Sequence, residues 1–458
     1  RPEIDNVYAA WELAFKDQLF ALLSRSIIAF TQYHYYSSYI SDKLLMIESH
    51  YEELMYQRVH NPQIANNDSC EQLLIGLNYI RSLVRYLSDD YQQGVQLFKE
   101  TQSQMQRTGH FYLHAYVERF IANSYKRLAR IEEATWHFTE SIRYAEQNND
   151  PYAKTTSLTM LASLATQQGK QTVAASHLHE AYLLLQKYPD KFLEATYHNH
   201  CGDYYHAQGY WEEAYDSYQK SMQAISTGYN YHSLGKILWQ SGRFELSKEY
   251  LERVDITNKI NNYRYGNFWH IIWLIDFANL YIAWRKPEQS IFYSQLACEH
   301  AQKQGWKLLY GRALKAQGAA QIQFQQWQQA ERNLTLALDI FTLEATVDHQ
   351  CSALTQLIEM QCARGEVAGA AQNAEKLWKI LEEGSPDMTN AEPIKARWAC
   401  YLGFTSVDDG QAKAAIQSAY KLFQEQFAHI YDETWRKAFS THIAEHHALL
   451  QVVNTTVV

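Results

Sequence analysis

Large apolar side chains stand one helical turn after small ones in this chain, and the pairing recurs at a nearly constant interval. Successive small residues are 40, 40, 40, 33, 43, 40, 40 and 45 positions apart. They are Gly94, Ala134, Ala174, Ala214, Ser247, Ser290, Ala330, Ala370 and Ala415. A companion series lies twelve residues earlier, at Ser82, Ala122, Ala162, Gly202, Gly235, Ala278, Gly318, Ile358 and Gly403. Antiparallel helices approach closely only where facing side chains are small, so each pair of positions predicts one helix–turn–helix unit.

Two further offsets support this unit. Four positions after the small residue of the second helix (the series from Gly94 to Ala415) stands a large side chain that we expect to pack at the helix crossing. These side chains are Phe98, Phe138, Leu178, Tyr218, Leu251 and Leu334. Five positions before the same small residue, a glycine in the left-handed conformation would end the first helix; these are Gly169, Gly209, Gly242, Gly365 and Gly410. Tyr182, Tyr218 and Tyr293 are expected to belong to the core.

The pattern resembles the tetratricopeptide repeat. The clearest copies read LASLATQQGKQTVAASHLHEA, CGDYYHAQGYWEEAYDSYQKS and QGAAQIQFQQWQQAERNLTLA, and the resemblance covers residues 75–425. It implies an all-α fold, a right-handed α-solenoid of about nine to ten helix pairs. The period near 40 exceeds the family's usual 34, which predicts longer helices. A generic helical repeat such as HEAT is the alternative, and the Gly-to-Ala spacing favours the tetratricopeptide interpretation.

Three stretches rich in Asn, Asp, Gly and Pro predict loops, at residues 60–70, 255–267 and 382–393. We expect an N-terminal helical segment with a degenerate first repeat in 1–70. A first arm of repeats follows in 71–255, a second arm in 256–430, and a closing helix and tail in 431–458.

The two ends resemble parts of STAND-type signalling ATPases (NACHT/NB-ARC-like). PEIDNVYAAWELAF (2–15) is similar to the E-x-D-N-x-x-A-A-x-x-W-A segment that joins a winged-helix domain to repeats. WRKAFSTHIAEHHALL (435–450) is similar to the helix R-x-x-F-L-x-x-V-P-x-H-x-x-L that closes such arrays, with Ala444 in place of Pro. The chain begins at Arg1 without a Met, so we expect it to be a piece of a longer polypeptide.

This resemblance implies an upstream ATPase domain in the same polypeptide and a sensor role for the repeats. In that family the repeats hold the ATPase closed until a ligand binds, and signal transduction in bacterial defence is the context we expect. The chain itself has no G-x-x-x-x-G-K-[ST] loop, because Gly169-Lys170 is followed by Gln171 and Gly235-Lys236 by Ile237. A free-standing scaffold that assembles partner proteins is the alternative function.

Composition narrows the function classes. The net charge of −9 argues against a general nucleic-acid surface, which needs excess Lys and Arg. The six cysteines are scattered, as in reduced thiols of a cytoplasmic protein. No run of about 18 apolar residues predicts a membrane span, and no signal peptide is evident.

In a tetratricopeptide superhelix, one face of each first helix points into the concave groove. Projecting that face gives a mixture of polar and aromatic residues. They are Tyr79, Tyr116, Arg119, Asn123, Lys126, Asn199, Asp203, His206, His232, Lys236, Trp239, Asp276, Asn279, Arg312 and Lys315. Asn can bond the backbone of an extended peptide, and Arg and Lys can hold carboxylates or phosphates. We predict that the groove binds a peptide, a protein or a polar ligand; an ordinary solvated helix face is the alternative.

Two groups of histidine and acidic residues have the composition of a metal site. His442, Glu445 and His446 fit the H-x-x-E-H pattern of inverted zinc proteases, but they coincide with the closing helix and lack a third ligand. His200, Asp203 and His206 lie near Cys201 on one predicted helix, where a polar stripe is the simpler interpretation. We therefore predict no catalytic residues, no metal and no cofactor, with a metallohydrolase as the enzyme-class alternative.

Overall fold

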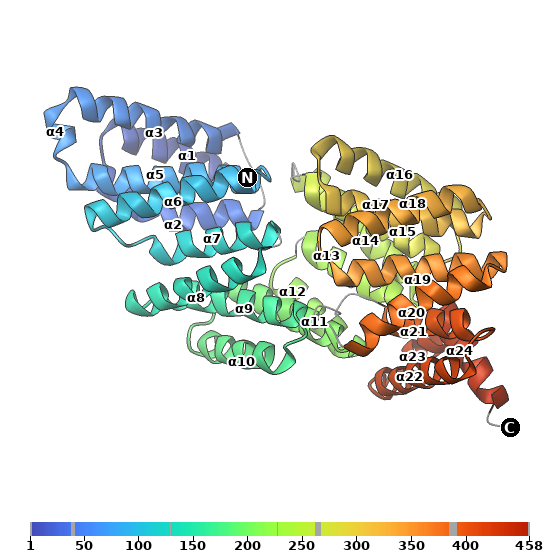
Figure 1. Ribbon diagram of the computed structural model, residues 1–458. Helices are drawn as coiled ribbons and strands as arrows, with labels where there is room; N and C mark the ends of the chain where they lie inside the picture. The colour runs from blue at the N-terminus through green and yellow to red at the C-terminus, as the bar shows by residue number, and fades with distance from the viewer. Residues whose placement is uncertain are drawn as a thin grey trace. The chain divides into compact units, whose positions relative to one another are not determined.

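The computed structural model describes the backbone of residues 2–37, 42–128, 130–226, 228–261, 267–383 and 392–456. Within these ranges all regular secondary structure is α-helical, with consecutive helices packed in antiparallel pairs (Figure 1). The predicted all-α fold is therefore confirmed.

The helices follow one another with short connections. In chain order they are α1 (Pro2–Lys16), α2 (Phe20–Ser37), α3 (Asp42–His60), α4 (Pro62–Ala65), α5 (Asp68–Leu87), α6 (Tyr91–Thr108), α7 (His114–Arg127), α8 (Ile131–Gln147), α9 (Pro151–Gln167), α10 (Gln171–Lys187), α11 (Lys191–Ala207), α12 (Trp211–Ala224), α13 (Gly228–Gln240), α14 (Phe244–Asn261), α15 (Asn267–Ala283), α16 (Pro287–Gln304), α17 (Lys307–Gln323), α18 (Trp327–Leu343), α19 (Val347–Arg364), α20 (Val367–Glu383), α21 (Pro393–Phe404), α22 (Asp409–Ala428), α23 (Glu433–Thr441) and α24 (Ala444–Thr456).

The chain forms two compact units, and the division falls within α9 and α10. Unit 1 comprises residues 1–161, 180–188 and 258–266. Unit 2 comprises residues 162–179, 189–257 and 267–458.

The small residues form the helix crossings that the sequence predicts. A Cβ on Gly202 would lie 2.4 Å from Cε1 of Tyr218, and one on Gly318 would lie 2.7 Å from Cγ of Leu334. Both large side chains are almost fully buried. Each first helix thus leaves the space that the large side chain of the second helix fills.

The turn between the two helices of a pair uses the left-handed conformation. The φ angles of Gly169, Gly209, Gly242 and Gly365 are +68°, +76°, +83° and +73°, as predicted. The prediction is wrong for Gly410, which lies in the first turn of α22, where Asp408 caps the helix by accepting from the N–H of Gln411 at 2.9 Å. In other pairs the same position is Asp89, Arg285 or Gln325, with φ of 63°, 58° and 58°.

Three local predictions need correction. Tyr182 is 42% exposed, whereas Tyr218 is buried as predicted. Residues 60–70 are not simply a loop, because Asn61 caps the short helix α4 and Asn67 caps α5 through side-chain bonds to backbone N–H groups. The loop predicted at 255–267 is wrong for residues 255–261, whose backbone continues α14. The backbone at 262–266, the side chains of 255–267 and most of the predicted loop at 382–393 lie outside the described residues.

Unit 1 has an aromatic core. The rings of Phe98 and Phe120 stack with centroids 5.7 Å apart, and Tyr79 packs against both. A buried pair, Glu118 with His137 at 2.6 Å, joins α7 to α8.

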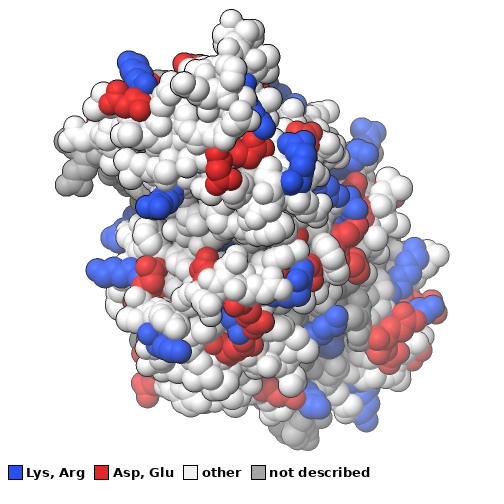
Figure 2. Space-filling model, turned by 90° about the vertical axis from the view of Figure 1, so that its left-hand side faces the viewer, with Lys and Arg blue, Asp and Glu red and all other residues white. Residues whose placement is uncertain are grey.

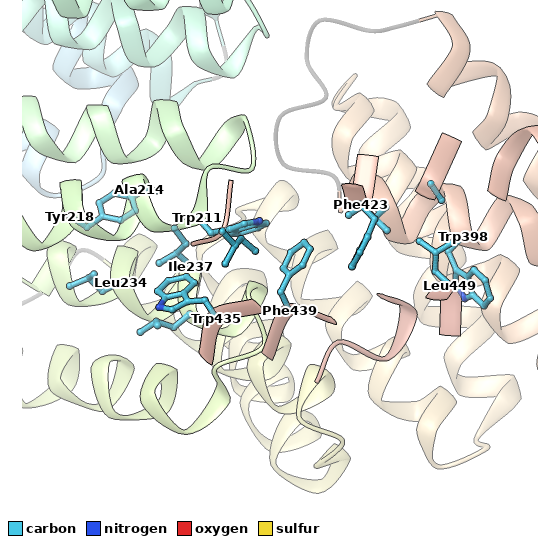
Figure 3. Packing of buried hydrophobic residues seen from close by; sticks show 14 residues of the cluster. Trp211, Ala214, Tyr218, Leu234, Ile237, Trp398, Phe423, Trp435, Phe439 and Leu449 are labelled. Carbon is cyan, nitrogen blue, oxygen red and sulfur yellow. The ribbon is translucent and has the colours of Figure 1, made fainter. Parts of the chain in front are cut away.

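In unit 2 the C-terminal segment packs against helices about 200 residues earlier in the chain. One oxygen of Glu212 accepts the backbone N–H groups of Tyr431 and Asp432, both at 2.8 Å. Figure 3 shows the buried cluster behind this contact, in which Phe439 lies between Trp211 and Phe423. The end of the array is thus docked on α12 and on the start of α14.

His442 completes this docking. Its ring nitrogen Nδ1 lies 2.9 Å from the carbonyl oxygen of Gly242, and its ring lies 6.4 Å from that of Phe244. The segment predicted as one closing helix forms two, α23 and α24, with His442 as the C-terminal cap of α23.

Candidate binding surface of unit 2

The first helices of successive pairs form one layer in unit 2. Helix α13 packs beside α15, α15 beside α17, α17 beside α19, and α19 beside α21. We call these five helices the first-helix layer. His232 and Lys236 lie on α13, Asp276 on α15, and Arg312 and Lys315 on α17. Side chains that the sequence predicts for a groove therefore come from adjoining helices.

A short contact joins the first two of these helices. Nε2 of His232 lies 2.5 Å from Oδ2 of Asp276, and Asp276 is 3% exposed. Burial raises the pKa of this carboxyl, but the hydrogen bond from His232 and the charges of Lys236 and Arg312 outweigh it, so the pKa lies below its ordinary value. Asp276 therefore carries a negative charge between cations of α13 and α17.

Positive charge exceeds negative charge around this aspartate. Burial lowers the pKa of Lys315 to about 8, and the charges of Arg312 and Lys395 act in the same direction. The pKa of His349 on α19 lies well below its ordinary value because of burial and of the cations Arg312, Lys315 and Lys236. Three cations thus act on a single imidazole, which stays neutral.

The cations differ in their partners. Nζ of Lys315 donates to Oγ of Ser352 at 2.9 Å, which links α17 to α19. Lys236 and Arg312 are half-buried, and neither forms a hydrogen bond or ion pair with another described residue. Their donors remain available.

A small pocket, with room for about one water molecule, adjoins Lys315 through Ser352. It is lined by Ser352, Thr355, Gln356, Glu392, Lys395 and Ala396. Gln356 is 7% exposed, and its Oε1 has no hydrogen-bond partner among the described residues. A buried acceptor without a partner is costly, so a bound group that donates to it would be stabilised.

Lys395, which lines the pocket, is the centre of a cluster of opposite charges. Nζ of Lys395 lies 2.7 Å from Glu445 of α24, 3.8 Å from Glu359 and 3.9 Å from Glu392. Desolvation opposes the charge of Lys395, but the carboxylates hold its pKa well above its ordinary value. Burial raises the pKa of Glu359 to about 7, whereas Lys395 overcomes burial at Glu445 and lowers its pKa to about 2. Lys395 therefore connects the pocket to the closing segment.

Other predicted groove residues of unit 2 lie on α11, α13 and α15. Asn199 accepts from Nδ2 of Asn230 at 3.2 Å. Burial and the charge of Lys236 lower the pKa of His206 to about 4. Trp239 is 8% exposed, and Asn279 is half-buried.

The predicted groove residues of unit 1 are mostly occupied in helix packing. Tyr79 is 1% exposed in the aromatic core, and the hydroxyl of Tyr116 donates to Asp150 at 2.7 Å. Arg119 is 3% exposed and lies over the ring of Phe120 at 4.7 Å. Asn123 is buried as well, and only Lys126 is half-buried.

The sequence projection missed the contribution of α19 and α21. Ser352 and Thr355 stand forty residues after Arg312 and Lys315, so continuing the repeat by one period would have found them. His349 and Gln356 flank them on the same helix. A second step of forty residues, from Thr355, reaches Lys395.

The side chains of the two histidine groups have other partners. His442 and His446 do not share a helix, and Nδ1 of His446 lies 2.8 Å from the carbonyl oxygen of Phe439. Glu445 pairs with Lys395. Asp203 accepts from the hydroxyl of Tyr218 at 2.8 Å and lies 3.3 Å from His200. Among the described residues, no group of three or more His, Cys, Asp or Glu side chains is placed to hold a metal ion.

Comparisons with solved structures place the fold. A Rap protein complexed with Competence and Sporulation Factor matches with a TM-score of 0.53 and 14% identity, over 75% of this chain and 99% of that one. NprR in complex with its cognate peptide NprX matches with a TM-score of 0.50 and 13% identity, over 83% and 98%. This chain is a TPR-like α-solenoid.

A STAND protein with a tetratricopeptide repeat sensor from Pyrococcus horikoshii aligns with a TM-score of only 0.35 and 14% identity, over 91% of this chain and 55% of that one. No protein-family model matches the sequence, and no curated protein matches it either.

Surface charge and hydropathy agree with the composition. On the face that Figure 2 shows, Lys and Arg are interspersed with Asp and Glu, without a broad patch of one sign. Among the described helices, none is long and apolar enough to cross a membrane.

Proposed function

We propose that this chain is a ligand-sensing module that binds an extended peptide or protein segment on the first-helix layer of unit 2. The observation that carries the proposal is the convergence of side chains from four adjoining helices on one polar surface. Among the residues that the structure describes, the donors of Lys236 and Arg312 and Oε1 of Gln356 have no hydrogen-bond partner. A surface with unused buried polar groups gains free energy when a ligand pairs them. The solved complex of NprR with its cognate peptide, on a related fold, supports a peptide as the ligand.

The sensor belongs, in this proposal, to a STAND-type signalling ATPase whose catalytic domain precedes Arg1 in the same polypeptide. The likeness of residues 2–15 and 435–450 to the ends of such arrays supports this context. All six cysteines are unpaired thiols, which supports a cytoplasmic location. A free-standing scaffold is the second candidate, and the presence or absence of a nucleotide-binding domain in the complete gene product decides between them.

Sensing needs a link from the binding surface to the rest of the module. Lys395 lines the pocket and also holds Glu445 of α24. A ligand that engages Lys395 would weaken its hold on the closing segment, and the released segment would favour a second conformation of the array. The ligand would then relieve autoinhibition by shifting the population between the two states.

Selection from a phage-displayed library of 12-residue peptides tests the binding proposal. The full chain is the target, and Asn279→Trp and Leu336→Trp are the comparison variants. Asn279 lies on the first-helix layer, whereas Leu336 is 43% exposed on α18. We expect selected peptides to bind the wild type and Leu336→Trp equally and to lose at least tenfold in affinity for Asn279→Trp. Peptides that bind all three proteins equally would contradict the proposal.

A further inference from the structure

The first-helix layer of unit 2 contains a local charge imbalance. Three cations, Lys236, Arg312 and Lys315, act on the neutral His349, as the previous sections describe. Two carboxylates act on them: Asp276, whose Oδ2 lies 2.5 Å from Nε2 of His232, and Glu392, which acts on Lys315 together with the further cation Lys395. Inside a protein such an excess of like charge is unfavourable until an anion neutralises it.

The cations adjoin an acceptor that also lacks a partner. Ser352 accepts from Lys315 and lines the same pocket as Gln356. Oε1 of Gln356 has no partner among the described residues, although the side chain is 7% exposed. A ligand placed here can give negative charge to the cations and an N–H donor to Gln356.

From this arrangement we infer that Arg312, Lys315 and Lys236 bind an anionic oxygen group of the ligand, a carboxylate or a phosphate, while Gln356 accepts an N–H donor beside it. The inference rests on the proposed binding function and specifies which chemistry the surface selects. Arg312 is the central residue because a guanidinium offers two parallel N–H donors that match the oxygens of these groups.

The carboxylates around Lys395 set the position of the anion. Glu359, Glu392 and Glu445 surround Lys395 and repel a second negative group beside it. The anion therefore belongs at the Arg312 side. An acidic residue of a peptide, with its backbone N–H directed at Gln356, satisfies both requirements.

Calorimetric titration of the full chain with citrate and with inorganic phosphate, at constant ionic strength, tests this site. We expect saturable binding with one ion per chain, weakened at least tenfold in Arg312→Gln. The matched control is Arg332→Gln, which removes an exposed arginine of α18 and should leave binding unchanged. Tighter binding of citrate assigns a carboxylate, and tighter binding of phosphate assigns a phosphate.

Saturable binding that is equal in Arg312→Gln and the wild type, or no saturable binding of either ion, would overturn the inference. Circular dichroism checks the folding of each variant, and Arg312→Lys, which keeps the charge but not the paired donors, should bind with intermediate affinity. The selected peptides separate the two proposals. A peptide whose binding is lost in Asn279→Trp but unchanged in Arg312→Gln would contradict the anion site alone. A peptide whose binding is unchanged in Asn279→Trp would contradict the proposed binding surface itself.

Discussion

At the residue scale, several side chains in unit 2 are held in states that water would not favour. His446 is 6% exposed, with its ring 4.3 Å from that of Phe439. Burial lowers its pKa to about 4, so its imidazole is neutral in the folded chain. Gln325 and Arg285 occupy left-handed backbone positions that cost a side chain about 1 kcal/mol or more.

We expect acid to destabilise unit 2 through His446. An unfolded histidine gains a proton near pH 6.5, whereas the folded one gains it only near pH 4. The unfolded state therefore binds more protons in this window, and stability falls by ~3 kcal/mol as pH decreases from 6.5 to 4. Urea unfolding at pH 7 and pH 4.5 measures this loss, which should be smaller in His446→Asn. The control is His179→Asn at an exposed position; an equal loss in both variants would contradict the account.

Gln325→Gly should stabilise the chain by about 0.5–1 kcal/mol, because glycine adopts φ of 58° without the steric cost that a Cβ imposes. Gly365 holds the equivalent turn one repeat later, and a Cβ there would meet nothing within 4 Å. Gly365→Ala therefore tests only the cost of the left-handed backbone conformation, and it should destabilise the chain by a similar amount. The urea midpoints of the two variants should move in opposite directions; movement in the same direction would contradict the left-handed assignment.

At the scale of helices, local spacing predicts the pairs but not where the array closes on itself. Small residues such as Gly202 and Gly318 mark the helix crossing in the sequence, because the two helices that meet there belong to one repeat. The contact of Glu212 with Tyr431 and Asp432 spans about 220 residues and leaves no periodic signal. The two-helix form of the closing segment was missed for the same reason, because His442 ends α23 through its contact with Gly242.

Lys395→Met should destabilise unit 2 by about 2–3 kcal/mol, less than the loss of a fully buried partner, since it leaves the half-buried carboxylates Glu359 and Glu445 without their cation. Glu445→Gln should cost less, because Glu359 remains beside Lys395 to balance its charge. Limited proteolysis of residues 431–456 and urea unfolding would measure both effects. A larger loss in Glu445→Gln than in Lys395→Met would contradict this description of the cluster.

At the scale of the whole chain, the groove projection located residues of one surface only in unit 2. The residues that it selected there, Lys236, Asp276, Arg312 and Lys315, lie on adjoining first helices. In unit 1 the same projection selected Tyr79 and Arg119, which are buried in helix packing. The small residues alone do not show which face of a helix is turned towards the groove. Which first-helix faces remain polar and accessible depends on tertiary packing.

Affinity for an anionic ligand should fall as pH rises through about 8, because Lys315 then loses its charge. Burial and the charges of Arg312 and Lys395 oppose the charged form of Lys315, whereas Glu392 and Asp276 favour it. Because burial dominates, Lys315 loses its charge at a pH below the ordinary lysine pKa. Titration with citrate from pH 7 to pH 9.5 measures the effect. Lys315→Arg keeps its charge throughout and should show a flatter profile; identical profiles would contradict a role for Lys315.

The most direct test of the central claim is photo-crosslinking with a library-selected peptide that carries benzoylphenylalanine, followed by mass-spectrometric mapping of the adducts. Binding on the first-helix layer predicts adducts on α13, α15, α17 and α19, with none on the partner helices α14, α16, α18 and α20. Adducts confined to the partner helices, or to unit 1, would contradict the claim.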